Sequence, residues 1–107
     1  MKYLKGINNP KIILPRVNES NYHVWHIFAV RCIDRDKLEK YLNEKGIGTN
    51  KHYPTPIHLQ GAYSDLKFKK GDYPIAEKIS MYEISLPMFY GMTEEEIEYV
   101  IATINKF

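Results

Sequence analysis

The sequence predicts an α+β domain in which a small, mostly antiparallel sheet is covered by helices. Three observations support this prediction. Residues 22–32 are rich in aromatic and β-branched side chains and lack turn formers, which is typical of a strand. Apolar residues around 38–42 and 97–104 recur at the spacing of amphipathic helices. Between them, residues 83–86 alternate polar and apolar and stop at Pro87, which indicates a short second strand.

Composition limits the class of protein. With 107 residues, 44% hydrophobic and 26% charged, the chain has room for one globular domain with a modest core. A net charge of +2 without a long basic run gives no case for a nucleic-acid or membrane partner. The lone Cys32 excludes an internal disulfide, and nothing resembles a signal peptide or a membrane span, so we expect a cytoplasmic setting. Nine tyrosines suggest an aromatic surface that meets a ligand or a protein.

The first twenty residues contain little regular structure. Residues 1–6 have a helical pattern that stops at Gly6. The apolar run 12–14, bounded by prolines, is expected to be an edge strand or an extended connector, and residues 18–21 a polar loop.

The predicted strand 22–32 is apolar on both faces, which places it centrally in the sheet. One face would carry Val24, His26, Phe28, Val30 and Cys32. His26 would therefore face the core or a cleft beside it, and two readings stay open: a core histidine bonded to a carbonyl, or a site residue.

Local signals delimit the two long helices. Asp34 is expected to cap the first helix, and Gly46 to end it in a left-handed conformation. Thr93 and Glu96 have the spacing of a capping box at the start of the last helix. The apolar stripe of this helix consists of Ile97, Val100, Ile101 and Ile104.

A third, shorter helix is expected to begin at Pro74, which suits the first helical position, with Ile75 and Ile79 on one face. Before it, residues 59–68 are expected to be irregular or short helix, and residues 69–72 a turn.

Residues 49–58, Thr-Asn-Lys-His-Tyr-Pro-Thr-Pro-Ile-His, are the strongest candidate for a site. Two prolines exclude a helix and preorganise the segment, while two histidines, a tyrosine and a lysine supply groups that donate, accept or stack. An ordinary connector is the competing reading. The spacing of histidines and cysteine matches no metal site, and no nucleophile elbow, phosphate loop or carboxylate pair is present. The residues alone therefore indicate a binding module with an aromatic, histidine-bearing loop and without a complete set of catalytic residues.

Several short motifs occur in a familiar order. They are Tyr-Leu (3–4), the run 10–15 with its two prolines, His-Val-Trp-His (23–26), Arg-Asp (35–36), Lys-Gly-Ile (45–47), His-Tyr-Pro-Thr-Pro-Ile-His-Leu-Gln (52–60), Ala-Tyr (62–63), Tyr-Pro-Ile-Ala-Glu (73–77) and Ser-Leu-Pro (85–87). Over essentially the whole chain, this order resembles the C-terminal portion of the DegT-type (DegT/StrS) nucleotide-sugar aminotransferases, which depend on pyridoxal phosphate.

The resemblance implies an organisation and a function. Residues 1–20 would be the remnant of an interdomain connection, and residues 21–107 the C-terminal small domain of a fold-type I aminotransferase. The complete enzyme would be a homodimer that transfers an amino group from glutamate to a keto-deoxysugar nucleotide, for surface polysaccharide (lipopolysaccharide) or deoxyaminosugar biosynthesis. The family's Schiff-base lysine belongs to a large N-terminal domain that this sequence lacks. We therefore expect this chain to be an inactive fragment that binds no pyridoxal phosphate by itself.

The resemblance also implies roles for residues. His52, Tyr53 and His58 would bind and orient the sugar nucleotide, and acid or base work by His58 stays open. The sequence of residues 52–60 resembles the members that aminate the 3-keto position of a dTDP-linked 6-deoxyhexose more than those that act at the 4-keto position. A stand-alone, non-catalytic interaction or carbohydrate-binding module is the alternative.

Overall fold

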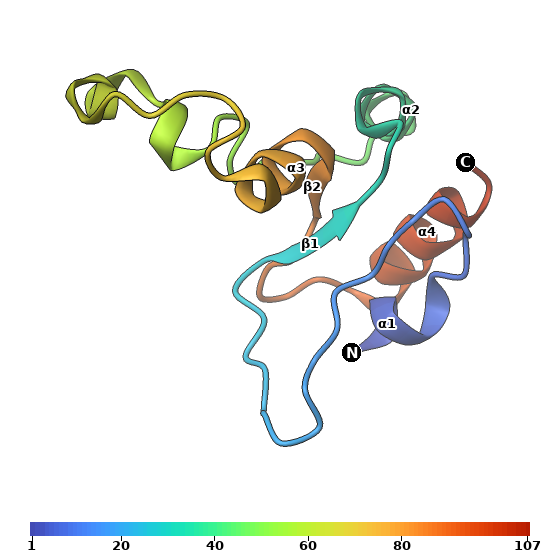
Figure 1. Cartoon of the computed structure of the whole chain (residues 1–107). Helices are drawn as coiled ribbons and strands as arrows, with labels where there is room; N and C mark the ends of the chain where they lie inside the picture. Colours follow the sequence, from blue (N-terminus) through green and yellow to red (C-terminus); the bar gives the residue numbers. More distant parts are fainter.

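The computed structural model covers residues 1–107 and confirms the predicted α+β class (Figure 1). Its elements in order are α1 (Lys2–Gly6), β1 (Phe28–Arg31), α2 (Arg35–Glu44), the 3-10 helices η1 (Ile57–Leu59) and η2 (Gly61–Leu66), α3 (Pro74–Tyr82), β2 (Glu83–Leu86) and α4 (Glu94–Asn105). None of these helices is long and apolar enough to cross a membrane.

The sheet is small and antiparallel, as predicted. Strands β1 and β2 pair with Phe28 opposite Leu86 and Arg31 opposite Glu83. Single bridges extend each outer edge, from Ile13 to Arg31 and from Asn50 to Ser85. The run 12–14 thus contributes one edge contact, and the loop that follows α2 is tied directly to β2.

The predicted length of the first strand is wrong. Residues 22–27 are irregular, because Trp25 adopts a φ of +52° and its backbone N–H donates to His23 Nδ1 at 2.9 Å. The ring of Trp25 stacks on His23 at 4.0 Å between centroids, so local contacts replace sheet pairing there. His26 is exposed, and the reading of a core histidine is therefore wrong.

The hydrophobic core lies where the sheet meets α1, α2 and α4. Phe28, Leu38, Leu42, Ile84 and Ile104 have no exposed surface. The N-terminal residues belong to the same core.

Tyr3 in α1 is the largest of these N-terminal core residues. It is 1% exposed, packs its ring 5.1 Å from that of Phe28, and donates its hydroxyl to the Pro87 carbonyl at 2.9 Å. Burial raises the pKa of Tyr3 to about 12. The first residues are therefore packed as part of this domain.

The C-terminal end of α2 follows its local signal, whereas the N-terminal end lacks the predicted side-chain cap. Gly46 has a φ of +75°, Gly46 N–H donates to Asn43 at 3.0 Å, and Ile47 N–H donates to Leu42 at 2.9 Å, which is a Schellman ending. Asp34 occupies the N-cap position of α2, but its carboxylate pairs with Lys37 instead of capping.

The capping box of α4 is confirmed in both directions. Thr93 N–H donates to Glu96 Oε2 at 2.8 Å, and Glu96 N–H donates to Thr93 Oγ1 at 3.2 Å. Helix α4 is thereby ordered from its first turn, and its apolar stripe meets the core.

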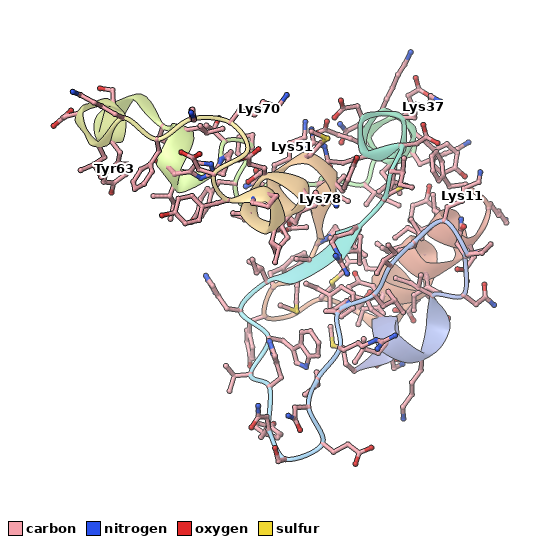
Figure 2. All side chains as sticks on the ribbon, in the orientation of Figure 1. Lys11, Lys37, Lys51, Tyr63, Lys70 and Lys78 are labelled. Atoms are coloured by element: carbon pink, nitrogen blue, oxygen red, sulfur yellow. The ribbon has the colours of Figure 1, made fainter.

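Residues 57–73, here called the arm, project from the body toward one end of the molecule (Figure 1). Tyr63 and Lys70 of the arm lie apart from the side chains that surround α4 (Figure 2). Helix α3 follows the arm and begins at Pro74, as predicted. Ile75 and Ile79 on α3 are 76% and 42% exposed, so this apolar face meets no core of its own chain.

Candidate functional site

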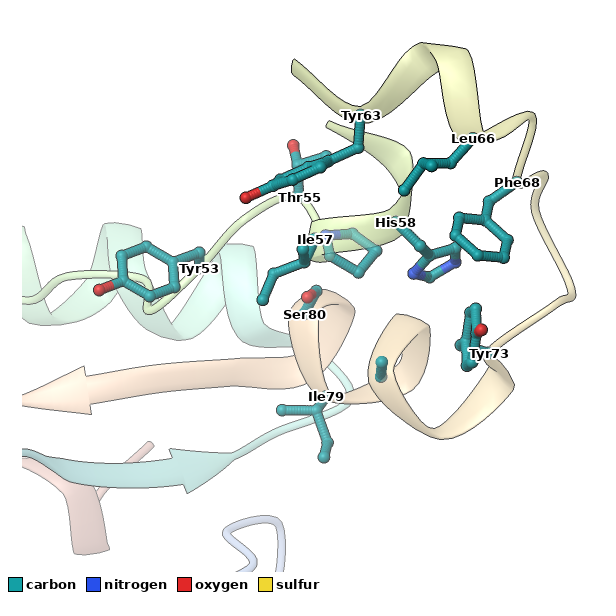
Figure 3. Close-up of a pocket in the computed structure, with 12 residues that line it drawn as sticks. Tyr53, Thr55, Ile57, His58, Tyr63, Leu66, Phe68, Tyr73, Ile79 and Ser80 are labelled. Carbon is teal, nitrogen blue, oxygen red and sulfur yellow. The ribbon is translucent and has the colours of Figure 1, made fainter. Parts of the chain in front are cut away.

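The structure places the three predicted site residues at two separate cavities. Tyr53 and His58 line a cavity of about 590 Å³ between the loop 53–58, the arm and α3 (Figure 3). His52 lines another, of about 280 Å³, together with His26, Asn50 and Ser85. The sequence did not separate the two directions in which the side chains of this segment point, and the binding roles of the three residues stay predictions.

The larger cavity has an aromatic wall. Eight of its twelve lining residues are hydrophobic, and none is Lys, Arg, Asp or Glu. Phe68, His58 and Tyr73 gather at one end of the cavity, and Tyr53 stands at the other (Figure 3). The rings of Phe68 and Tyr73 meet edge to face at 5.4 Å between centroids. Such a wall offers stacking and apolar contact with few polar anchors, which suits a flat or partly apolar ligand group.

Tyr53 is the most accessible of the predicted residues. Its side chain is 65% exposed, and its hydroxyl has no hydrogen-bond partner within the chain. The ring meets that of His52 edge to face, with centroids 5.5 Å apart. The ring is thus held at one edge while the hydroxyl stays free to bond a ligand.

His58 is held inside the arm. Its side chain is 7% exposed, its Nε2 lies 3.0 Å from Glu77 Oε1, and its ring packs edge to face on Tyr73 at 4.9 Å. The same oxygen of Glu77 accepts the Gly71 N–H at 2.8 Å. These contacts, the Gly71 N–H first, hold the pKa of Glu77 below its usual value. His58 therefore links η1 to α3. Its Nε2 is occupied by this contact, so the ring contributes mainly surface to the cavity.

His52 is bonded to buried polar residues of β2. Its Nδ1 lies 2.9 Å from Ser85 Oγ, and its backbone N–H donates to Glu83 Oε2 at 2.8 Å. Glu83 and Ser85 are only 3% and 4% exposed. Sequence reasoning missed both residues. The one signal was the polar alternation of 83–86, which local periodicity assigns to solvent and the fold buries.

Lys51 forms ion pairs with the neighbouring helix α2. Its Nζ lies 2.6 Å from Glu39 Oε2 and 3.7 Å from Asp36 Oδ1, both on α2. The Arg35 guanidinium, which donates to Asp36, holds the pKa of that carboxyl below its usual value. The only lysine of the 49–58 segment thus points away from both cavities.

The lining of these two cavities does not fit pyridoxal phosphate. Binding and tuning this cofactor requires a lysine for the Schiff base and an acidic or basic partner for the pyridine nitrogen. Neither cavity is lined by any Lys, Arg, Asp or Glu. Nor do three His, Cys, Asp or Glu side chains meet in a group that could hold a metal ion.

Comparison with known proteins gives a consistent result. The model of the DegT/DnrJ/EryC1/StrS aminotransferase family matches residues 2–105. Among curated proteins, the dTDP-3-amino-3,6-dideoxy-alpha-D-galactopyranose transaminase of Aneurinibacillus thermoaerophilus is 42% identical over 98% of this chain and 28% of its own length. The dTDP-3-amino-3,4,6-trideoxy-alpha-D-glucose transaminase of Streptomyces venezuelae is 40% identical over 99% of this chain and 28% of its own length.

Solved structures agree with these matches. The crystal structure of Streptomyces venezuelae DesV in complex with a ketimine intermediate superposes with a TM-score of 0.93 at 35% identity, over 98% of this chain and 29% of that one. A DegT DnrJ EryC1 StrS aminotransferase from Brucella abortus gives 0.82 at 27% identity, over 98% and 27%. The chain thus spans less than a third of the length of the proteins that it matches.

Proposed function

Because the chain belongs to the DegT/DnrJ/EryC1/StrS aminotransferase family, we propose that it is the C-terminal small domain of an enzyme that transfers an amino group from glutamate to a keto-deoxysugar nucleotide. In this proposal residues 1–20 connect to the rest of that enzyme and pack α1 against the small domain, which residues 21–107 form. Pyridoxal phosphate supplies the electron sink for transamination when it is bound, and its ligands lie outside these residues. The chain alone is therefore inactive in this proposal.

One observation supports a role for this chain in substrate binding. The loop 52–58 presents an exposed tyrosine with a free hydroxyl at the mouth of an aromatic cavity. A sugar nucleotide combines flat and apolar faces with hydroxyls, so it needs stacking surface and a few hydrogen bonds. Tyr53 contacts the substrate through its hydroxyl. His52 has partners at both ring nitrogens and His58 at Nε2, so these two contribute ring surface and orientation.

The names of the two curated relatives guide the choice of substrate. Both are dTDP-3-amino-deoxysugar transaminases. We propose a dTDP-linked 3-keto-6-deoxyhexose as the substrate, in a pathway of deoxyaminosugar or surface polysaccharide synthesis. The complete enzyme acts in the cytoplasm as a homodimer, with this domain closing one side of the sugar-nucleotide pocket.

The test uses the complete enzyme that contains this chain, assayed with the dTDP-3-keto sugar and glutamate. Tyr53→Phe and His58→Ala are each expected to lower kcat/KM about tenfold, which corresponds to ~1.4 kcal/mol of transition-state binding. Tyr99→Phe is the matched control, because its hydroxyl donates to the Lys45 carbonyl and its side chain lines neither cavity.

The outcomes separate the alternatives. Thermal stability is measured for each variant first, since His58 also fastens the arm. Unchanged kinetics in both variants would make the loop 52–58 an ordinary connector. A complete protein without transaminase activity, whose small domain still bound the sugar, would favour a non-catalytic carbohydrate-binding module.

A further inference from the structure

We propose that Asn50, Ser85 and Glu83 are positioning residues that hold the unprotonated form of the His52 ring in the tautomer with its proton on Nδ1. The proposal rests on the proposed function only in taking the loop 52–58 as the substrate wall. The hydrogen bonds around His52 are satisfied with only one assignment of donors and acceptors. That assignment determines which ring nitrogen of His52 carries the proton.

The chain of hydrogen bonds begins at Asn50. The Lys51 N–H donates to Asn50 Oδ1 at 2.8 Å, so this contact identifies the oxygen of the amide. The amide nitrogen Nδ2 is then the atom that lies 3.3 Å from His52 Nε2. A carboxamide nitrogen donates and does not accept, so Nε2 must accept and carries no proton.

The second step places the proton on the other ring nitrogen. A neutral imidazole with a bare Nε2 is protonated at Nδ1, and Nδ1 lies 2.9 Å from Ser85 Oγ. Ser85 Oγ accepts the hydrogen bond from this Nδ1–H and donates its own hydroxyl hydrogen to Glu83 Oε1. The other oxygen of Glu83 accepts the His52 backbone N–H at 2.8 Å. Each donor thus has one acceptor, and the chain ends on a carboxylate.

Burial makes this arrangement rigid. Glu83 and Ser85 are only 3% and 4% exposed, so little water competes for their hydrogen bonds. Backbone bonds between Asn50 and Ser85, at 2.8 and 3.2 Å, align the loop with β2. His52 is therefore held at both ring nitrogens and at its backbone, and it presents a fixed edge to the adjoining Tyr53 ring.

This arrangement argues against an acid or base role for His52. A proton added to Nε2 would face the amide hydrogens of Asn50, donor against donor. In the loop 52–58, His52 acts as a fixed ring that orients Tyr53. Asn50, Ser85 and Glu83 act through His52 and touch no substrate in this scheme.

The test is a nitrogen-15 NMR measurement on the 107-residue chain labelled at histidine, at a pH above the usual titration range of imidazoles. We expect His52 Nδ1 to resonate as a protonated, pyrrole-like nitrogen and Nε2 as an unprotonated, pyridine-like one. His58 is the internal control. Its Nε2 faces the carboxylate of Glu77, which only accepts, so it is expected to show the opposite tautomer in the same spectrum. A proton on Nε2 of His52, or a mixture of tautomers, would overturn the proposal.

Asn50→Asp sharpens this test. The introduced carboxylate keeps the shape of the side chain and its bond to the Lys51 N–H, but it offers only acceptors to the imidazole. Nε2 of His52 is expected to gain a proton, while Asn43→Asp on α2 is expected to leave His52 unchanged. If Nε2 stays unprotonated in a folded Asn50→Asp variant, the assigned direction is wrong. The spectra need neither cofactor nor substrate, so their failure leaves the proposed transaminase function standing, and unchanged kinetics of Tyr53→Phe leave the tautomer standing.

Discussion

The Nε2 atom of His58 lies 3.0 Å from Oε1 of Glu77, and this contact joins η1 to α3. The same oxygen accepts the N–H groups of Gly71 at 2.8 Å and Tyr73 at 3.4 Å. The Glu77 carboxylate therefore contacts both ends of the arm and connects them to the first turn of α3. Glu77 thereby holds His58 and Tyr73, two residues that line the larger cavity.

Acid is expected to release the arm. The folded pKa of Glu77 is lowered, so its stabilising effect is complete above the ordinary glutamate pKa of ~4.3 and is lost as pH falls through the lower folded value. Hydrogen exchange across residues 57–73 is expected to accelerate in this acidic range while the exchange of α4 stays slow.

Glu77→Gln tests the cause of this acid response. The amide cannot become charged, so the arm should exchange faster at neutral pH and lose its added acid sensitivity. Glu98→Gln, on the exposed face of α4, is the matched control. An acid response of the arm that survives in Glu77→Gln would assign it to another group.

Gly46→Ala is expected to destabilise the domain by ~1–2 kcal/mol, because an alanine is strained in the left-handed conformation. Gly46 has a φ of +75°, and no atom lies within 4 Å of an added Cβ, so the cost is one of backbone conformation alone.

Gly48→Ala is the control for this backbone effect. It has equal space without a positive φ and should be neutral or slightly stabilising. Urea unfolding of both variants measures the difference, and equal stabilities would contradict the Schellman ending.

Leu42→Ala is expected to cost ~2–5 kcal/mol, since Leu42 is fully buried in the core. Ile101→Ala should cost less, because Ile101 is only partly buried against Gly6 of α1. Ile33→Ala, 80% exposed, serves as the control and should change stability by less than ~0.5 kcal/mol. Thermal unfolding gives all three values, and a Leu42→Ala variant as stable as Ile33→Ala would show that α2 packs differently.

The pure 107-residue chain is expected to show no transamination of a keto-sugar nucleotide above a blank of free pyridoxal phosphate. Neither of its two candidate cavities has a lysine with which to hold the cofactor. Mixing the chain with pyridoxal phosphate should likewise give no absorbance band of an active-site Schiff base. Turnover above the blank would mean that these residues contain catalytic groups that neither cavity reveals.

Much of the fold could be predicted from the sequence, because its signals act within a few residues. The ending of α2 at Gly46, the start of α3 at Pro74 and the capping box of Thr93 and Glu96 all depend on backbone groups one helical turn away. The spacing of apolar residues likewise identified Leu42 and Ile104 as core. The family could also be identified from the sequence, because several short motifs occur in the family's order along the chain.

Only the tertiary structure decided the extent of the first strand and the environment of the site. Composition favoured a strand over 22–32, but pairing requires a partner, and β2 offers one only opposite Phe28–Arg31. Glu83 and Ser85 alternate like solvent-facing residues, yet the loop at His52 covers them from more than thirty positions away in the chain. His52 and His58 differ in role for the same reason. Their partners, Ser85 and Glu77, lie on other elements, and a hydrogen bond between distant segments leaves no periodic trace in the sequence.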